Sequence, residues 1–481
     1  MTEWVPVLVV FVPFLAGVVQ FMAGRRVIAW WPVLASVATV AVSLWLTFAV
    51  AAGGGIEHFM GGWQPPLGIA LRADGLATVM ILLTAVVGGL VSVYALEAHG
   101  TGDPRASHFW ALWLMLWGSL NALFLSADLF NIYVTLELVT LAAIPLVLLA
   151  GPEKTVTAAL RYLQFALFGS LLYLAGVALT YGLAGSLDLA LVGPALTDGG
   201  ITGAVAATCM VVGLLVKAAV FPFHVWLPAA HGGAPAAVSA ILSALVVKAA
   251  VYLLLRLWTG PLAGLADGLV AQLMGALGAA AILYGSIQAF RQERLKLVVA
   301  YSTVAQLGYM LLFFPMAVAQ AWEGAVYHGL SHGVAKAALF LAAGNVLVYL
   351  GHDRVRDLKG LDRSLSVSLL AFGIAGVSIM GLPPSGGFIA KWLLLRASLE
   401  TGQWWWAVVL ISGGLLAAAY IFRVLRYAFL QAPDRPPATT GPIPPPIMAL
   451  PATLLALLAI ALGFTAAPLL ALLGGLPEGT G

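Results

Sequence analysis

The stretch KAAVFPFHVWLPAAHGGAPAAVSAILSALVVK, residues 217–248, is apolar except at a few positions that helices in lipid rarely carry. A lysine stands at each end, and three prolines and two glycines lie between them. Pro222 lacks a backbone N–H and disrupts the turn before it, so the helix that carries Lys217 should be discontinuous there. From residue 235 to 258 an apolar run follows that is long enough to cross a bilayer. The stretch therefore predicts a broken membrane helix beside a buried charge.

The composition of the whole chain supports a location in lipid. Of the 481 residues, 62% are hydrophobic and only 9% are charged, and the mean hydropathy is +1.03, far outside the range of soluble domains. The 22 basic residues are scattered among short loops and form no stripe that would bind nucleic acid. The single cysteine, Cys209, has no partner for a disulfide, a zinc site or an iron–sulfur cluster. We expect no cofactor and no catalytic chemistry on this chain alone, and any electron transfer in another subunit.

Apolar segments of about the length needed to cross a hydrocarbon core of ~30 Å recur along the chain. Glu3 stands where a secretory signal would carry basic residues, so the first segment is expected to be retained. The longest polar stretches, 52–75 and 431–446, are rich in proline and glycine and predict links rather than soluble domains. The expected fold is an all-α polytopic membrane protein. Its predicted spans are 4–23, 28–51, 76–96, 108–126, 129–150, 155–184, 201–222, 235–258, 266–290, 297–316, 321–350, 365–398, 404–431 and 446–474.

The loop charges predict the orientation of these spans. With the N-terminus outside, Arg72 is nearly the only clear loop cation on the outer side, whose loops instead carry Glu57, Asp188, Asp198, Asp267 and Glu323. By the positive-inside rule the basic side is cytoplasmic, so both termini are expected on the outer side of a bacterial-type inner (cell) membrane. The cations on the basic side are Arg25, Arg26, Arg105, Lys154, Arg291, Arg294, Lys296, Arg354, Arg356, Lys359, Arg363 and Arg435.

Ionisable residues inside the predicted spans are the candidate functional groups, because each costs roughly 2.5–3.5 kcal/mol near the bilayer centre. Glu137 is the only acid well inside a span. A long lysine stem could instead bring its ammonium to the interface, an alternative that applies best to Lys391. A buried lysine that cannot do so is suited to loading and releasing a proton. The other residues at or near membrane depth are Lys217, Lys248, Lys336, His224, His231, His328 and His332.

The segment AVYHGLSHGVAKAALF places His328, His332 and Lys336 at i, i+4 and i+8, on one helical face. Histidine exchanges protons near neutral pH through both ring nitrogens, so this stripe predicts a proton wire. Two alternatives stay open: a metal site, for which no third ligand is evident, and a histidine pair with a purely structural hydrogen-bonding role.

A second break is predicted in SIMGLPPSGGFIAKW, residues 378–392, where Pro383 and Pro384 precede Lys391. Paired helices interrupted by glycine and proline in the two halves of a transporter indicate internal repeats with ion sites at the breaks. An ordinary proline kink would explain each interruption, but not the lysine beside it.

Four segments, 217–248, LKLVVAYSTVAQLGYM, HGLSHGVAKAALFLAAG and GLPPSGGFIAKW, together resemble the antiporter-like subunit family. This family comprises the large subunits of Mrp-type sodium/proton antiporters and the antiporter-like membrane subunits of respiratory complex I. The resemblance spans about 60–475 and implies fourteen helices, built from two inverted five-helix repeats that each contain a broken helix. It implies an N-terminal three-helix segment (1–107), two half-channel repeats (108–258 and 259–431), and a linker with a last helix (432–481).

The resemblance also implies roles for the buried residues. Glu137 and Lys217 would form the charge pair of the first half-channel, and Lys248 would connect the halves. The second-half relay would be His328, His332 and Lys336, and Lys391 would end the axis. The sequence departs from the family at Ala229, where an acid is frequent, and at Thr135–Leu136, where aromatics are common, which puts the gating at the first break in question. The residues expected at the breaks and gates are Pro222, His224, Pro228, His231, Pro383 and Pro384.

The predicted function is proton translocation as a membrane subunit of a multisubunit cation/proton antiporter, similar to the D-type subunit of Mrp antiporters. The expected partners are other membrane subunits, protons, Na⁺ as a candidate second ion, and lipid, with no nucleic acid. A proton-pumping subunit of a complex I-related redox complex, of NADH-quinone oxidoreductase or hydrogenase type, is the alternative. Two further classes stay open: a membrane scaffold whose charges only hold helices together, and an intramembrane metalloenzyme or small-solute carrier.

Overall fold

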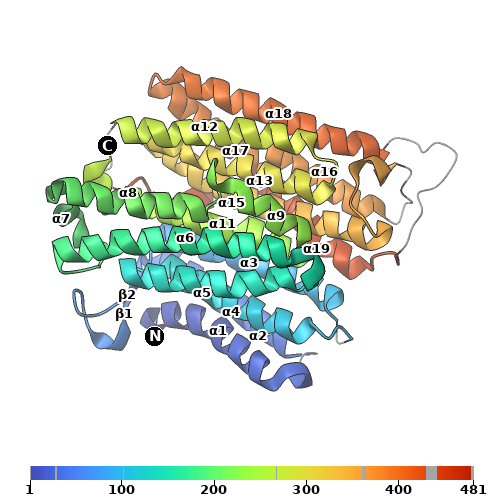
Figure 1. The fold of residues 1–481 in the computed structure, drawn as a ribbon, viewed down its shortest axis with the longest axis horizontal. Coiled ribbons are helices and arrows are strands. Elements are labelled where there is room, and N and C mark those ends of the chain that lie inside the picture. Colours follow the sequence, from blue (N-terminus) through green and yellow to red (C-terminus); the bar gives the residue numbers. More distant parts are fainter. Residues whose placement is uncertain are drawn as a thin grey trace.

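The computed structural model describes residues 2–27, 30–100, 102–266, 268–359, 361, 365–429 and 441–477, without the side chains of 152–154. Its long helices run side by side along one common direction (Figure 1). The N-terminal end, the strands β1 and β2 and helix α7 lie at one end of the bundle, which we call the terminal face. The other end, which carries Arg105, Arg294 and Arg354, is called the basic face. The predicted loop positions Asp267, Arg363 and Arg435 and the side chain of Lys154 lie outside the described residues.

The first half of the chain builds three helices and then a block that contains the first break. A hairpin of β1 (Ile56–Phe59) with β2 (Ala70–Ala73) lies in the connector between α2 and α3. The helices are α1 (Val5–Ala23), α2 (Trp31–Gly53), α3 (Gly75–Ala98), α4 (Ala106–Leu125), α5 (Leu129–Leu148), α6 (Pro152–Ala184), α7 (Val192–Asp198), α8 (Gly200–Lys217), α9 (Trp226–Gly233), α10 (Ala236–Ile241) and α11 (Val247–Trp258).

The second half repeats the pattern of long helices with one interruption. Short 3₁₀ turns join several elements, and the segment Leu242–Val246 between α10 and α11 is a π-helix. The helices are α12 (Gly268–Arg291), α13 (Leu295–Leu311), α14 (Phe313–Met316), α15 (Ala319–Leu350), α16 (Ser366–Met380), α17 (Gly386–Glu400), α18 (Trp404–Phe429), α19 (Pro446–Ala461) and α20 (Ala466–Leu473). The 3₁₀ turns are Thr2–Trp4, Gly24–Val27, Met60–Gly62, Phe223–Val225, Ala263–Leu265 and Val355–Leu358.

The predicted polytopic membrane fold is confirmed. Twelve spans within the described residues are long and apolar enough to cross a membrane, and the pair α19 and α20 adds a thirteenth if it is counted as one span. The remaining predicted span, 365–398, is divided between α16 and α17. The predicted span at 446–474 is divided between α19 and α20, which meet at an angle of 80°, a bend that the sequence analysis did not predict.

Both predicted breaks are present. Helix α8 ends at Lys217, and the chain then runs irregularly through Pro222 before α9 begins at Trp226. In the second half α16 ends at Met380, and α17 begins at Gly386 with Ser385 as its N-cap. Proline cannot donate the hydrogen bond that would continue the helix, so the interruptions fall where the sequence places Pro222 and the Pro383–Pro384 pair.

The helices that carry Lys248 and Lys336 are among the most enclosed of the described spans. In the most apolar part of Ala236–Trp258 every residue is buried, and in that of Ala319–Leu350 the buried share is 89%. The corresponding share is 33% for Trp404–Phe429, which lies on the outside of the bundle. A helix that faces lipid can stay apolar all round, whereas a helix in the bundle interior can carry polar groups that contact other helices. Lys248 and Lys336 therefore lie away from lipid, with relative exposures of 0%.

Candidate functional site

The first charged cluster joins α5, α6 and α8. The Nζ atom of Lys217 lies 3.2 Å from Oε1 of Glu137 and 3.0 Å from Oγ1 of Thr140. Ser170 of α6 donates a hydrogen bond to the same oxygen of Glu137. The side chain of Lys217 is only 6% exposed and that of Glu137 19%. The structure thus brings together the two charges that the sequence predicted as a pair, and it adds two hydroxyl groups that the sequence did not single out.

Two glycines allow this cluster to form. Gly169 on α6 and Gly213 on α8 face each other so closely that a Cβ added at Gly213 would lie 2.5 Å from the carbonyl oxygen of Gly169. Small residues at such a crossing let two membrane helices approach along their backbones. The close approach places Ser170, the residue next to Gly169, beside the carboxylate of Glu137.

We therefore predict that Gly169→Leu weakens both folding and transport. The added side chain must push α8 away, which we expect to cost about 1–3 kcal/mol and to lengthen the contact between Glu137 and Lys217. Gly182→Leu on the same helix is the matched control, because an added Cβ there meets no described atom within 4 Å. Thermal unfolding in detergent and proton flux in vesicles would measure the two effects. Equal behaviour of both variants would contradict the prediction.

A small cavity connects the first cluster with the helix of the central lysine. Its volume is about 20 Å³, and its lining includes Lys217, Thr140 and Trp226 together with Ala249 and Ala250 of α11. A cavity of this size has room for about one water molecule. A water-sized space therefore lies between Lys217 and the helix that carries Lys248.

The central lysine follows the π-helical segment Leu242–Val246. Its Nζ atom donates a hydrogen bond to the carbonyl oxygen of Ser243, and the hydroxyl of Ser243 lies 2.8 Å from that of Thr303 on α13. Single π-helical turns inside α-helices occur frequently at functional sites. Lys248 has no carboxylate within ion-pair distance among the described residues, so no neighbouring charge neutralises its ammonium.

The predicted polar stripe of α15 is present and buried. The rings of His328 and His332 stack with centroids 5.7 Å apart. Both ring nitrogens of His332 lack a hydrogen-bond partner among the described residues. Lys336 donates to the carbonyl oxygen of Val299 at 2.7 Å and to the hydroxyl of Ser302. The stripe therefore joins α15 to α13 at its lysine end.

Lys391 lies in α17 and binds across the second break. Its Nζ atom donates to the carbonyl oxygens of Ile379 at 2.8 Å and Met380 at 3.2 Å, and it lies 4.5 Å from the ring centre of Tyr309. The last carbonyls of a helix have no partner within the helix and carry partial negative charge, so they suit an ammonium group. The ring of Tyr309 is 5.1 Å from that of His328, which makes it the aromatic link between the stripe and Lys391.

Of the residues predicted at the breaks, the two histidines pack against aromatic rings, and the prolines lie in the interruptions or line a pocket. His224 packs beside Tyr284 with ring centres 4.8 Å apart, and His231 stacks on Phe340 at the same separation. Neither ring nitrogen of His231 has a hydrogen-bond partner in the part of the chain that the structure describes. Pro228 lines a pocket on the basic face. The predicted prolines Pro222, Pro383 and Pro384 lie within the two interruptions.

The assignment of Lys296 to the loop cations is wrong. Lys296 is the second residue of α13, is 1% exposed and donates to the carbonyl oxygen of Ala234 at the end of the first break. Asp353 accepts from its backbone N–H at 3.1 Å and from Arg294 Nε at 2.9 Å. In the sequence Lys296 is two residues from Arg294, which is half exposed, so no pattern separated the buried cation from the exposed one.

A pocket of about 950 Å³ opens on the basic face and reaches Lys296. At its rim His99 and Asp103 are joined by a contact of 3.1 Å. Burial lowers the pKa of His99, although Asp103 opposes this effect. Burial alone would raise the pKa of Asp103, but hydrogen bonds from Arg105 and His99 bring it below its usual value. The rim therefore carries a neutral imidazole beside an ionised carboxylate at neutral pH.

No group of three or more histidine, cysteine, aspartate or glutamate side chains placed to hold a metal ion occurs among the described residues. His328 and His332 thus have no third ligand there. The chemistry that the arrangement supports is exchange of protons among lysine, histidine and glutamate side chains in a region enclosed by apolar helices.

Comparisons with known proteins place the chain among membrane subunits of ion-translocating complexes. Residues 126–417 match the family model described as NADH:quinone oxidoreductase/Mrp antiporter, TM. NADH-quinone oxidoreductase subunit N of Desulforudis audaxviator is 36% identical over 465 residues, which cover 92% of this chain and 90% of the relative. The D-type subunit of a Na⁺/H⁺ antiporter of Alkalihalophilus pseudofirmus is 29% identical over 431 residues, covering 88% and 86%. A chain in the structure of the Mrp complex from Dietzia sp. superposes with a TM-score of 0.89 at 25% identity, covering 98% and 96%.

Proposed function

The chain belongs to the NADH:quinone oxidoreductase/Mrp antiporter transmembrane family, and we propose that it translocates protons as a membrane subunit of a multisubunit cation/proton antiporter of the Mrp type. The observation that carries the proposal is the buried pair of Glu137 and Lys217. A charge pair enclosed by apolar helices is costly, and in membrane proteins such residues mark ion pathways. The likeness to a D-type antiporter subunit supports the antiporter form of the proposal.

The other buried lysines support a path rather than a single site. Lys248, Lys336 and Lys391 contact backbone carbonyl or hydroxyl oxygens, and no carboxylate binds them among the described residues. A lysine held by neutral acceptors can keep the same contacts, more weakly, after it has lost its proton. Such groups are suited to passing protons, whereas a purely structural charge needs a permanent partner.

We propose the following sequence of events. While Glu137 and Lys217 are in contact, the carboxylate holds the lysine charged, and separation of the pair releases a proton toward Lys248. The proton then passes His332 and His328, with Lys336 beside them, and reaches Lys391. The water-sized cavity next to Lys217 supports the first step, because it extends to α11. The driving event comes from outside this chain, either as redox chemistry in a partner subunit or as an opposing ion gradient.

The basic face is proposed to be cytoplasmic, with both termini on the outer side of a bacterial inner membrane. The excess of arginine and lysine in the loops of that face supports this orientation. The partners are proposed to be further membrane subunits, because the family comprises subunits of NADH:quinone oxidoreductase and of the Mrp antiporter.

A proton-pumping subunit of a redox complex is the second candidate. The 36% identity to an NADH-quinone oxidoreductase subunit N favours it. In that case the same buried axis would move protons, and the free energy would come from electron transfer in another subunit.

Purification of the native complex through a tag on this chain separates the two candidates. We expect small membrane subunits of the Mrp type in the mass spectrum of the purified complex, and sodium-dependent proton flux after its reconstitution. Recovery of iron–sulfur or flavin subunits with the chain would instead assign it to a redox-driven pump. Isolation of the chain without any partner would contradict both forms of the proposal.

A further inference from the structure

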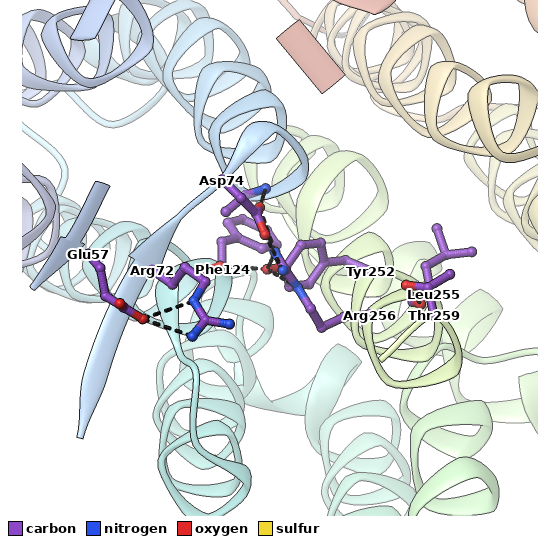
Figure 2. Close-up of polar contacts among 9 residues, drawn as sticks. Glu57, Arg72, Asp74, Phe124, Tyr252, Leu255, Arg256 and Thr259 are labelled. Carbon is purple, nitrogen blue, oxygen red and sulfur yellow. Dashed lines mark hydrogen bonds and ion pairs between the residues drawn. The ribbon is translucent and has the colours of Figure 1, made fainter. Parts of the chain in front are cut away.

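A polar network at the terminal face links the start of α3 to α11. Asp74 caps α3 by accepting from the backbone N–H of Ala77 at 2.9 Å. The guanidinium of Arg256 binds both oxygens of this carboxylate, with Nη2 to Oδ1 at 2.8 Å. Arg256 also donates from Nη2 to the hydroxyl of Tyr252 at 2.7 Å, and that hydroxyl donates to the carbonyl oxygen of Phe124 at 2.5 Å (Figure 2).

The network lies on the same helical face as the central lysine. Lys248, Tyr252 and Arg256 follow one another at i, i+4 and i+8 along α11. At a rise of 1.5 Å per residue, Arg256 lies roughly 12 Å from Lys248 along the helix axis. Tyr252 stands midway, so the three residues share one face of α11 from the buried lysine to the terminal face, while the Nζ atom of Lys248 itself is turned toward the carbonyl oxygen of Ser243.

The line ends at a pocket. A cavity of about 260 Å³ at the terminal face is lined by Asp74, Arg256, Thr259 and Arg72, among others. The side chain of Arg256 is 17% exposed and that of Asp74 35%. The ion pair therefore lies between the pocket and the buried part of α11.

The opposite charges of Arg256 and Asp74 are suited to controlling the passage of protons. An arginine cannot release its proton in a protein, so Arg256 places a fixed positive charge on the route between Lys248 and the pocket. Such a charge repels protons unless an anion offsets it. Burial alone would raise the pKa of Asp74, but the charge and hydrogen bonds of Arg256 bring it below its usual value, so the carboxylate is ionised at neutral pH.

We propose that Lys248 exchanges protons with the aqueous phase at the terminal face through Tyr252 and Asp74, with Arg256 as the residue that positions both. This inference rests on the proposed function and makes Lys248 the branch point of the axis, from which most protons leave at the terminal face and the rest continue to Lys391. In each passage the Lys248 ammonium turns from Ser243 toward Tyr252 and gives a proton over one water to the Tyr252 oxygen. The Tyr252 hydroxyl turns from the carbonyl oxygen of Phe124 toward Asp74, and its own O–H proton moves to the Asp74 carboxylate. Asp74 then releases it to water in the pocket. One proton is moved, and every group regains its initial charge once Lys248 is reloaded from the buried axis.

Two substitutions test the route in reconstituted complex. Tyr252→Phe keeps the ring and removes the hydroxyl, and Asp74→Asn keeps an acceptor for the helix cap and removes the charge. Each is expected to lower proton flux at least about tenfold, the effect of roughly 1.4 kcal/mol on a barrier. Glu57→Gln is the matched control, because Glu57 pairs with Arg72 at 2.8 Å beside the network and has an exposed side chain.

A thiol probe adds a readout that a merely structural role would not change. Ala190 lines the same pocket and is exposed, so Ala190→Cys in a Cys209→Ala background accepts a membrane-impermeant reagent. A cationic methanethiosulfonate should slow proton flux severalfold more than an anionic one of similar size. Equal effects of the two reagents, or normal flux in Tyr252→Phe and Asp74→Asn, would overturn the inference. If these variants are active while Glu137→Gln is inactive, the route fails and the proposed function stands; normal flux in Glu137→Gln would refute the proposed function itself.

Discussion

Replacing Glu137 with glutamine is expected to abolish proton transport. The amide has nearly the shape of the carboxylate and can still accept from Ser170, but it no longer neutralises Lys217 at 3.2 Å. An isolated charge left in a low-dielectric interior costs several kcal/mol, so Lys217 cannot cycle between a paired and an unpaired state. Each 1.4 kcal/mol on the barrier is about tenfold in rate, and we expect a loss of at least about a hundredfold.

The measurement is proton flux in vesicles that contain the purified complex. Glu97→Gln is the control, because it makes the same chemical change at an exposed position near the end of α3. The amount of assembled complex must be equal in all samples. Flux at the level of the unmodified complex in Glu137→Gln would remove the basis of the proposed mechanism.

The second large effect is expected for Lys248→Met. Methionine fills a similar volume and has no proton to carry, so transport between the two halves should stop. Because the ammonium of Lys248 has no carboxylate partner among the described residues, its removal is expected to leave the unfolding temperature unchanged or to raise it. A scaffold role predicts the reverse, namely lower stability with activity retained.

Proton flux and thermal unfolding on the same preparation distinguish these outcomes. Lys359→Met serves as the control, since Lys359 lies in a loop on the basic face and contacts the ring of Tyr427 at 5.4 Å. Lower stability together with normal flux in Lys248→Met would support the scaffold and exclude Lys248 from the path.

The sequence alone could predict the spans and the breaks because both depend on local chemistry. A long run of apolar residues favours lipid, and Pro222 removes a backbone donor and disrupts the turn before it. Proline alone is not sufficient, because Pro13 and Pro145 lie within α1 and α5. The 80° bend between α19 and α20 was not predicted, because the apolar pattern runs through it without a break, although Gly463 lies in the bend and Pro468 follows it. The π-helical turn before Lys248 was equally hidden, because the segment LSALV is as apolar as its surroundings.

Contacts within the candidate site were predictable only in part. The sequence marks Glu137 and Lys217 as unusual, but the expectation that they meet across 80 positions came from the family resemblance. Thr140, Ser170 and Ser302 gave no signal, because single hydroxyl residues are common in membrane helices and their partners depend on packing. Lys296 was misplaced for the same reason: its burial results from the chain around Ala234, which lies 62 residues away.

The hydrogen bonds from Lys391 to the end of α16 affect how freely the interrupted helix can bend. The ammonium ties two carbonyl oxygens on one half of the interrupted helix to a side chain on the other half. When the proton leaves, the amine loses its charge and one of its three N–H bonds, so the hydrogen bonds that join α17 to the end of α16 become weaker. The protonation state of Lys391 thus determines how firmly α16 and α17 are held together. Loss of the proton and bending between these two half-helices are therefore coupled.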